Sequence, residues 1–316
     1  MAGGAADVPL TTSRDRRTIL PPRSARGRLR ASGGRSIARK PLILYHNPYP
    51  IPGNRHKVPE TAFSLNTRPD IMIRGHIADT GHGPVGLFLH GFRSHCAGEK
   101  AMALTRHALA RGYSWARFDL AAHGASTGAL WEQTLSGWLE DALAVATLFA
   151  PRPLFLVGSS LGAWLAVLMA RSGRVPVAGL VLLAPAFNFL DRYYASLSDN
   201  LRQQWRREGY LMLPDLYGPP GAVYRLGYRL IEDAATHDVL SVPTVLPCPL
   251  TLIHGDRDEV VPLAVSQDFV RRVRAPAKRL AVIAGGDHRL TAAIPRILAE
   301  VDALWPRADA ATGARA

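Results

Sequence analysis

Cysteine and long apolar runs are both scarce in this chain of 316 residues. The two cysteines, Cys96 and Cys248, are too few for a disulfide framework, and this usage is typical of a reducing compartment. No apolar run approaches the ~18 residues that a membrane-spanning helix needs, so we expect no membrane span. The apolar content of 47% is typical of a globular protein with a large core. These features together predict a cytoplasmic protein.

Acidic residues are scarce at the N-terminus, where residues 1–40 hold nine Arg and one Lys against Asp7 and Asp15. Ten basic against two acidic residues give this stretch +8 of the formal net charge of +13. Residues 1–60 lack sustained apolar periodicity, which predicts a disordered basic arm. The arm also resembles a mitochondrial transit peptide, which makes mitochondria the alternative location, and a misassigned start would give the same pattern. Only two aromatic residues interrupt the arm, so we expect no nucleic-acid partner.

One short stretch organises the prediction for the rest of the chain. An apolar run at Leu154–Val157 leads into Gly158–Gly162, a Gly-x-Ser-x-Gly pattern, and an apolar segment with helical character follows. A strand, a sharp turn and a helix are the context in which this pattern becomes a nucleophile elbow. The hydroxyl of Ser160 would then be exposed at a strand end, with helix N–H groups aimed at a developing oxyanion. The competing interpretation is a tightly packed Gly/Ser turn without chemistry.

Short apolar runs alternate with helical patterns from about Phe63 to Trp305. This alternation predicts right-handed crossovers and a mostly parallel sheet with helices on both faces. An antiparallel pair of strands is expected at Phe63–Leu65 and Ile71–Ile77. Further strands are expected at Gly86–His90, Ser114–Asp119, Leu154–Val157, Leu180–Ala184, Leu250–His254 and Leu280–Ala284. Helices are expected at Ala101–Arg111, Trp131–Phe149, Pro262–Val273 and Thr291–Trp305.

The alternation breaks between Pro185 and about Leu246, where no strand pattern is present but aromatic residues are frequent. These aromatics are Phe187, Phe189, Tyr193, Tyr194, Trp205, Tyr210, Tyr217, Tyr224 and Tyr228. We interpret residues 186–246 as a helical cap insertion over the strand ends, and the alternative is an ordinary helix layer with aromatic core residues. The domain prediction is thus a disordered arm at 1–60, one folded domain at 61–306 and a disordered tail at 307–316.

A serine is a weak nucleophile at neutral pH and needs a base, which in turn needs an orienting acid. The loop after the Leu250–His254 strand carries Asp258, our candidate acid, and Asp256, the second choice. A loop that begins with two glycines carries His288, our candidate base, after the last strand. The competing interpretations are an acidic turn before a proline-started helix and a chance surface histidine. The order serine, acid, histidine is the order of α/β-hydrolases.

A candidate oxyanion hole follows from two backbone amides. The strand that ends in His-Gly can present the N–H of Phe92, and Leu161 directly follows the candidate nucleophile. The competing interpretation is a tight glycine turn without a catalytic role. Asp119 and His123 lie at another strand end, and we interpret them as groups that brace loops, because His123 precedes the serine in the chain.

These residues resemble the α/β-hydrolase superfamily from about Phe63 to Trp305. Longer stretches resemble its serine esterase branch that contains mitochondrial mycophenolic-acid acyl-glucuronide esterase, which is also described as a palmitoyl-protein thioesterase. The stretches are Gly158–Trp164, Arg117–Asp119, His123–Ser126, Thr134–Trp138, Leu230–Asp233, Cys248–Pro249 and Asp287–Arg289. The resemblance implies Ser160, Asp258 and His288 as a catalytic triad, with Phe92 and Leu161 as oxyanion donors.

The resulting prediction is an α/β-hydrolase fold, with a mostly parallel central sheet and a helical cap insertion. Its expected activity is cleavage of carboxylic ester or thioester bonds through an acyl-enzyme, without a cofactor or a metal ion. The expected substrate is a small ester or thioester, or an acylated protein. The chain departs from the branch at His90, where the relative has proline, and in the insertion. Alternatives are a serine peptidase and a non-catalytic ligand-binding protein on the same fold.

Overall fold

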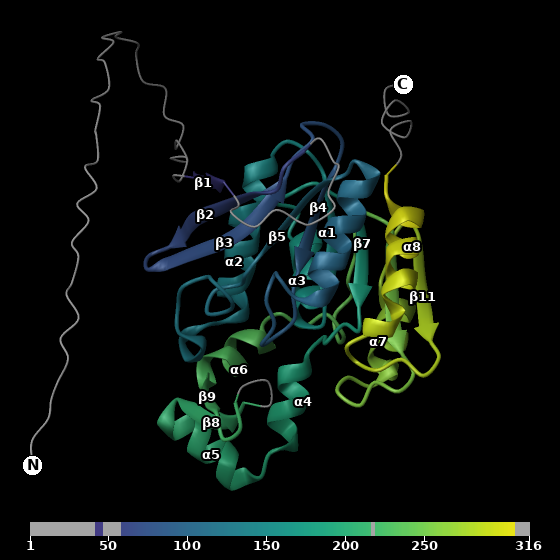
Figure 1. The fold of residues 1–316 in the computed structure, drawn as a ribbon. Coiled ribbons are helices and arrows are strands. Elements are labelled where there is room, and N and C mark those ends of the chain that lie inside the picture. The colour runs from purple at the N-terminus through teal and green to yellow at the C-terminus, as the bar shows by residue number, and fades with distance from the viewer. Residues whose placement is uncertain (1–41, 47–57, 216–218, 307–316) are drawn as a thin grey trace, which may run out of the picture. The chain divides into compact units, whose positions relative to one another are not determined.

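A nine-stranded sheet forms the centre of the fold (Figure 1). The computed structural model describes residues 42–46, 58–215 and 219–306. The strands of the sheet are β1 (Leu42–His46), β2 (Thr61–Arg68), β3 (Ile71–Ala78), β4 (Val85–Leu89), β5 (Ser114–Phe118), β6 (Leu154–Ser159), β7 (Val177–Leu183), β10 (Leu250–Gly255) and β11 (Lys278–Ile283). Their spatial order is β1-β2-β3-β5-β4-β6-β7-β10-β11. The pairs from β1 through β3 to β5 are antiparallel, and the pairs from β5 onward are parallel.

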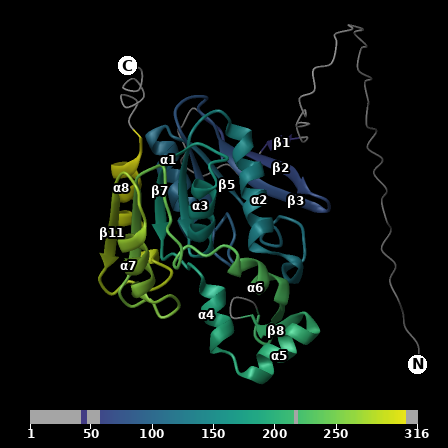
Figure 2. The same ribbon diagram turned by 180° about the vertical axis from the view of Figure 1, so that it is seen from behind.

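The central strands are apolar on both faces because helices cover both. In β4, Leu87 and Leu89 belong to one apolar cluster and Phe88 to the other, and β6 divides Leu156 and Phe155 in the same way. The first cluster also contains residues of α2 (Leu135–Ala146), α3 (Leu161–Arg171) and α7 (Leu263–Arg272), and the second those of α1 (Glu99–Arg111) and α8 (Ile294–Leu304). Figures 1 and 2 show α1 and α8 on the face opposite α2 and α3. Burial on both faces explains why these strands read as continuous apolar runs.

Outside the cap, three elements differ from the expectation. The helix expected at Thr291–Trp305 is a 3-10 turn, η3 (Thr291–Ala293), followed by α8. Strand β1 lies within the segment predicted to be disordered, and its residues Leu42 to His46 pair with β2 from Leu65 to Thr61. The rest of the arm and residues 307–316 lie outside the described residues. The single helix expected at Trp131–Phe149 is three pieces, with 3-10 turns η1 (Leu130–Glu132) and η2 (Thr147–Phe149) around a shorter α2. Helix α2 begins after Thr134, whose hydroxyl accepts from the N–H of Gly137 at 3.0 Å.

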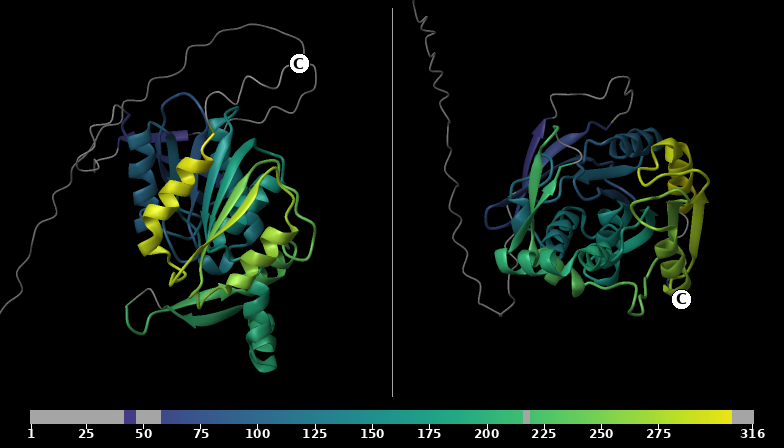
Figure 3. Two further views of the ribbon diagram at one scale, coloured as in Figure 1. Left: turned by 90° about the vertical axis from the view of Figure 1, so that its right-hand side faces the viewer. Right: turned by 90° about the horizontal axis from the view of Figure 1, so that it is seen from below.

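The cap insertion follows β7 and lies beyond the carboxyl ends of the parallel strands (Figure 3). It contains α4 (Phe189–Ser196), α5 (Asp199–Glu208), α6 (Tyr228–Ala235) and a hairpin of β8 (Tyr210–Pro214) and β9 (Val223–Gly227). The expectation of a wholly helical insertion without strands is therefore wrong. No local sequence pattern predicts the hairpin, because its stability depends on tertiary packing. The indole N–H of the fully buried Trp205, for example, donates to the Leu226 carbonyl at 2.9 Å.

Candidate active site

Ser160 lies at the turn between β6 and α3, on strained backbone. Its φ of 55° and ψ of −116° are unusual for a residue with a side chain. Its N–H donates to the Leu183 carbonyl at 2.8 Å, and its carbonyl accepts from the N–H of Ala163 at 3.0 Å. A Cβ on Gly162 would lie 2.1 Å from the Leu89 carbonyl oxygen, so the turn packs too tightly there for any side chain. The sequence prediction of a nucleophile elbow matches this geometry.

The structure brings His288 to Ser160 from the loop after β11. Its Nε2 lies 3.0 Å from the Ser160 hydroxyl oxygen, and its Nδ1 lies 2.7 Å from Oδ2 of Asp258. The same loop is fixed at its start, because the Gly285 N–H donates to Asp256 at 2.6 Å. With Nδ1–H donating to the carboxylate, Nε2 is free to accept the serine proton. The structure therefore brings together the three residues that the sequence selected as a triad.

The side chain of Asp258 is fully buried and heavily hydrogen-bonded. Its Oδ1 accepts from the N–H groups of Val260 and Val261 at 2.9 and 2.8 Å, and its Oδ2 lies 3.0 Å from Nε2 of His254. Burial opposes ionisation, but hydrogen bonds from His254, His288 and the Val261 N–H outweigh it and hold the pKa of Asp258 well below its ordinary value. Asp258 is therefore an ionised acceptor for His288 at neutral pH.

Two residues near Asp258 differ in what the sequence predicted for them. Asp256, the second choice for the acid, is exposed and accepts from the backbone of the His288 loop. His254, to which the sequence analysis gave no role, is fully buried and also lies 2.7 Å from the Ser266 hydroxyl through Nδ1. The position of His254 near a strand end, four residues before Asp258, could have indicated a role. A buried histidine in a strand, however, does not indicate a function until its partner is known.

The two amides predicted to form an oxyanion hole belong to residues close to the serine. Leu161 N–H belongs to the first residue of α3, and the loop of Phe92 follows Gly91, where an added Cβ would lie 3.2 Å from Cβ of Ser160. Within the described residues neither amide donates a hydrogen bond, so both are available to a ligand. Such donors can stabilise the negative charge that develops on a carbonyl oxygen when a serine attacks the acyl carbon.

A buried histidine orients the Phe92 amide. Nε2 of His90 accepts from the Leu120 N–H at 3.0 Å, which places the proton on Nδ1, and Nδ1 donates to the Gly91 carbonyl at 2.8 Å. Burial lowers the pKa of His90, so the ring is neutral. Because a trans peptide holds its N–H and C=O on opposite sides, this bond turns the Phe92 N–H away from His90. The His90 side chain thus contacts the peptide of the proposed oxyanion hole.

The predicted loop-bracing groups have the expected contacts. Oδ1 of Asp119 accepts from the Cys96 N–H at 2.6 Å and Oδ2 from the Ala125 N–H at 2.8 Å. Nε2 of His123 accepts from the Arg93 N–H at 3.2 Å, and its Nδ1 lies 3.0 Å from the Ala121 carbonyl. Burial lowers the pKa of His123 to about 3, and the neighbouring His90 adds to the shift. His123 therefore stays neutral and keeps Nε2 as an acceptor.

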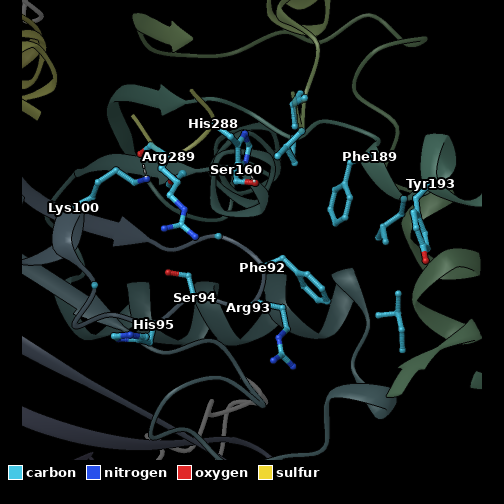
Figure 4. Close-up of a pocket in the computed structure, with 18 of the residues that line it drawn as sticks. Phe92, Arg93, Ser94, His95, Lys100, Ser160, Phe189, Tyr193, His288 and Arg289 are labelled. Atoms are coloured by element: carbon cyan, nitrogen blue, oxygen red, sulfur yellow. Dashed lines mark hydrogen bonds between the residues drawn. The ribbon is translucent and has the colours of Figure 1, made fainter. Parts of the chain in front are cut away.

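Ser160 and His288 open into a cavity of about 960 Å³ (Figure 4). On one side of Ser160 the wall carries Phe92, Phe189 and Tyr193, whereas Lys100 and Arg289 lie on the other. The Lys100 ammonium donates to the Arg289 carbonyl. The cavity thus has an apolar side built largely from the cap and a polar side built from the sheet loops.

Comparisons with known proteins identify the family. A sequence model of the alpha/beta hydrolase family matches residues 87–301. The chain belongs to the alpha/beta hydrolase family. The expected α/β-hydrolase fold and the resemblance to the thioesterase branch are both confirmed.

Several members of the alpha/beta hydrolase family are similar over most of the chain. The palmitoyl-protein thioesterase ABHD10, mitochondrial, of Bos taurus is 32% identical over 236 residues, which is 75% of this chain and 76% of the relative. The structure of alpha/beta hydrolase domain-containing protein 10 from mouse has a TM-score of 0.69 and 31% identity, covering 76% of this chain and 96% of that one. A putative hydrolase from Agrobacterium vitis S4 has a TM-score of 0.72 and 30% identity, covering 79% and 99%.

Two other kinds of feature are absent from the described residues. No helix among them is long and apolar enough to cross a membrane. No group of three or more His, Cys, Asp or Glu side chains among them could hold a metal ion. Both cysteines are buried and unbridged, and burial raises the pKa of each thiol to about 12.

Proposed function

We propose that this protein is a serine hydrolase that cleaves carboxylic ester or thioester bonds through an acyl-enzyme. One observation carries the proposal: a single chain of contacts joins the Ser160 hydroxyl, both ring nitrogens of His288 and the buried carboxylate of Asp258. Loss of one member would favour the alternative of a non-catalytic binding protein, and all three are present. The thioesterase names of the relatives support the reaction class.

The proposed reaction starts with attack of Ser160 Oγ on the acyl carbon, while His288 Nε2 takes the hydroxyl proton. Asp258 holds the imidazole in the required tautomer and stabilises the imidazolium that forms. The oxyanion accepts from the N–H groups of Phe92 and Leu161. His288 then returns its proton to the leaving alcohol or thiol. Water, activated by the same imidazole, hydrolyses the acyl-enzyme and frees Ser160. Each step uses groups of this chain, so the proposal needs neither a cofactor nor a metal ion.

The proposed substrate carries an apolar acyl group. The aromatic side of the cavity, with Phe189 and Tyr193 from the cap, would bury such a group, and the other side opens toward the leaving group. A small ester or thioester and an acylated protein both satisfy this arrangement. The word mitochondrial in the names of the relatives favours mitochondria, the alternative to the cytoplasmic expectation.

A fluorophosphonate probe tests the nucleophile directly. The probe should label the wild-type protein at Ser160, because only an activated serine attacks the phosphorus atom rapidly. Ser160→Ala should abolish labelling, and Ser159→Ala, which removes the neighbouring hydroxyl from the end of β6, serves as the matched control and should retain it. Peptide mass spectrometry locates the adduct. An adduct on another serine, or equal labelling of Ser160→Ala, would refute the proposal.

A further inference from the structure

The cap hairpin contacts the loop of the proposed oxyanion hole through Arg93. The Arg93 guanidinium forms an ion pair with the carboxylate of Asp215, which follows β8, and its Cζ lies 4.4 Å from the ring centroid of Tyr224 in β9. Both members of the ion pair are largely buried, with side chains 21% and 14% exposed. Partial burial and stacking make this pair stronger than an ion pair on the open surface. One side chain of the loop thus contacts the residue after β8 and a residue of β9.

The backbone of the same residue is fixed to the sheet domain. Arg93 has a φ of 60°, and its N–H donates to the neutral ring of His123. The preceding residue, Phe92, carries the proposed oxyanion donor. The Phe92 ring lies between the two regions, with centroids 5.9 Å from His123 and 6.3 Å from Tyr224. Contacts of Arg93 and of the Phe92 ring therefore connect the hairpin to the loop that carries the Phe92 N–H.

We propose that Arg93 is a positioning residue that aligns the Phe92 N–H by anchoring its loop to Asp215 and Tyr224 of the cap. This inference rests on the proposed hydrolase function. The hairpin also lines the acyl side of the cavity through Leu213 and Tyr224. An acyl group packed there holds the hairpin in place. The fixed hairpin then holds Arg93, and Arg93 holds the Phe92 N–H in the oxyanion hole. Binding energy of the acyl group then lowers the barrier of the chemical step in addition to tightening binding.

The test compares Arg93→Met with Arg225→Met. Arg225 lies on the same hairpin with its guanidinium 5.1 Å from the ring centroid of Tyr210, but it is exposed and does not line the cavity, so it is a matched control. Arg93→Met should lower kcat for p-nitrophenyl octanoate about 10-fold and change KM less than about 2-fold, since loss of a whole oxyanion donor costs ~100-fold or more. Arg93→Lys should recover part of kcat, and Arg225→Met should stay within about 2-fold of the wild type.

A double-mutant cycle separates alignment from mere stabilisation of the cap. Asp215→Ala should lower kcat in the same direction, and the Arg93→Met/Asp215→Ala double variant should lose little more than Arg93→Met alone. Octylboronic acid, whose tetrahedral serine adduct places an oxygen in the oxyanion hole, should bind Arg93→Met about 10-fold more weakly, whereas octanoate binding stays within about 2-fold. A raised KM with unchanged kcat, additive losses, or an equal loss in Arg225→Met would overturn the inference. Failure of the hydrolase proposal would look different, because the wild type would then show no Ser160-dependent hydrolysis.

Discussion

The sheet domain and the cap insertion form the same cavity but contribute different groups to it. Ser160, Asp258, His288 and the two proposed oxyanion amides lie at or shortly after the carboxyl ends of sheet strands. Within the described residues, the cap adds apolar side chains such as Phe189 and Tyr193 to the cavity wall and the anchor for Arg93, but no group that touches the Ser160 hydroxyl. Under the proposed function, separate parts of the chain would carry the bond-breaking chemistry and the choice of acyl group.

The sharpest test of this division is removal of the nucleophile from the sheet domain. Ser160→Ala should lower kcat/KM for ester hydrolysis by several orders of magnitude, because the variant lacks the hydroxyl that His288 contacts. The matched variant Ser159→Ala should change kcat/KM less than about 10-fold, and both should keep the melting temperature of the wild type within a few degrees. Comparable loss of activity in the two variants would place the nucleophile elsewhere.

The acid of the triad gives the next largest expected effect. Asp258→Asn should lower kcat by roughly 1,000-fold or more, since an amide cannot stabilise the imidazolium and favours the wrong tautomer of His288. Asp256→Asn keeps an oxygen that can accept from the Gly285 N–H, so its loss should stay below about 10-fold. Steady-state kinetics of the two variants decide between the carboxylates. A worse Asp256→Asn variant would mean that the acid is wrongly assigned.

The neutral histidine behind the oxyanion loop predicts a pH dependence of stability in the sheet domain. The ordinary pKa of 6.5 in the unfolded chain is lowered to about 3 in folded His123, because the ring is buried. The unfolded state therefore binds the extra proton first as pH falls below about 6.5, and the folded state loses stability. Between pH 7 and pH 5 this single group should cost about 2 kcal/mol of unfolding free energy.

Urea unfolding of the wild type and His123→Gln at both pH values measures this cost. Gln removes the titration and retains an acceptor for the Arg93 N–H. The difference in unfolding free energy between pH 7 and pH 5 should be about 2 kcal/mol smaller in the variant than in the wild type. An unchanged difference would show that His123 is protonated in the folded state at pH 5.

The parts of the structure that could be predicted from the sequence follow from local patterns. A serine, an acid and a histidine follow predicted strands in the chain order of α/β-hydrolases. Ser160, Asp258 and His288 could therefore be selected from the sequence. The central strands of the sheet are apolar on both faces, and continuous apolar runs indicated them. Strand β1 differs, since it is an isolated apolar run inside an otherwise basic and polar segment.

The rest depends on contacts between residues far apart in the chain. The β8–β9 hairpin owes its place to packing against Trp205 and the loop of Arg93, and no local periodicity records this. His254 and His90 are buried histidines whose roles emerge only through Asp258 and the Gly91 carbonyl. The aromatic cap residues divide in two: Phe189 and Tyr193 line the cavity, whereas Trp205 packs inside the insertion against Tyr228. Composition alone could not separate these groups.

That division sets the smallest predicted effect, which concerns acyl length. The cavity of about 960 Å³ has room for a medium-length chain beside Phe189 and Leu213, so octanoyl esters should be better substrates than acetyl esters. Each buried methylene contributes up to ~0.8 kcal/mol, and part of this is lost to chain ordering, so kcat/KM should rise severalfold or more over the series. Rates with p-nitrophenyl acetate, butyrate, hexanoate and octanoate measure the trend.

The cap is responsible for this preference only if truncating a cap side chain changes the slope of log kcat/KM against acyl length. Leu213→Ala should flatten the dependence of log kcat/KM on acyl length while leaving acetate hydrolysis within about 2-fold, because an acetyl group is too short to reach β8. Leu201→Ala, which truncates an exposed apolar side chain of α5 away from the cavity, is the matched control and should keep the wild-type slope. A steady decline in kcat/KM from acetate to octanoate would mean that the cap aromatics serve only the insertion's own core, and the separation of chemistry from acyl choice would fail.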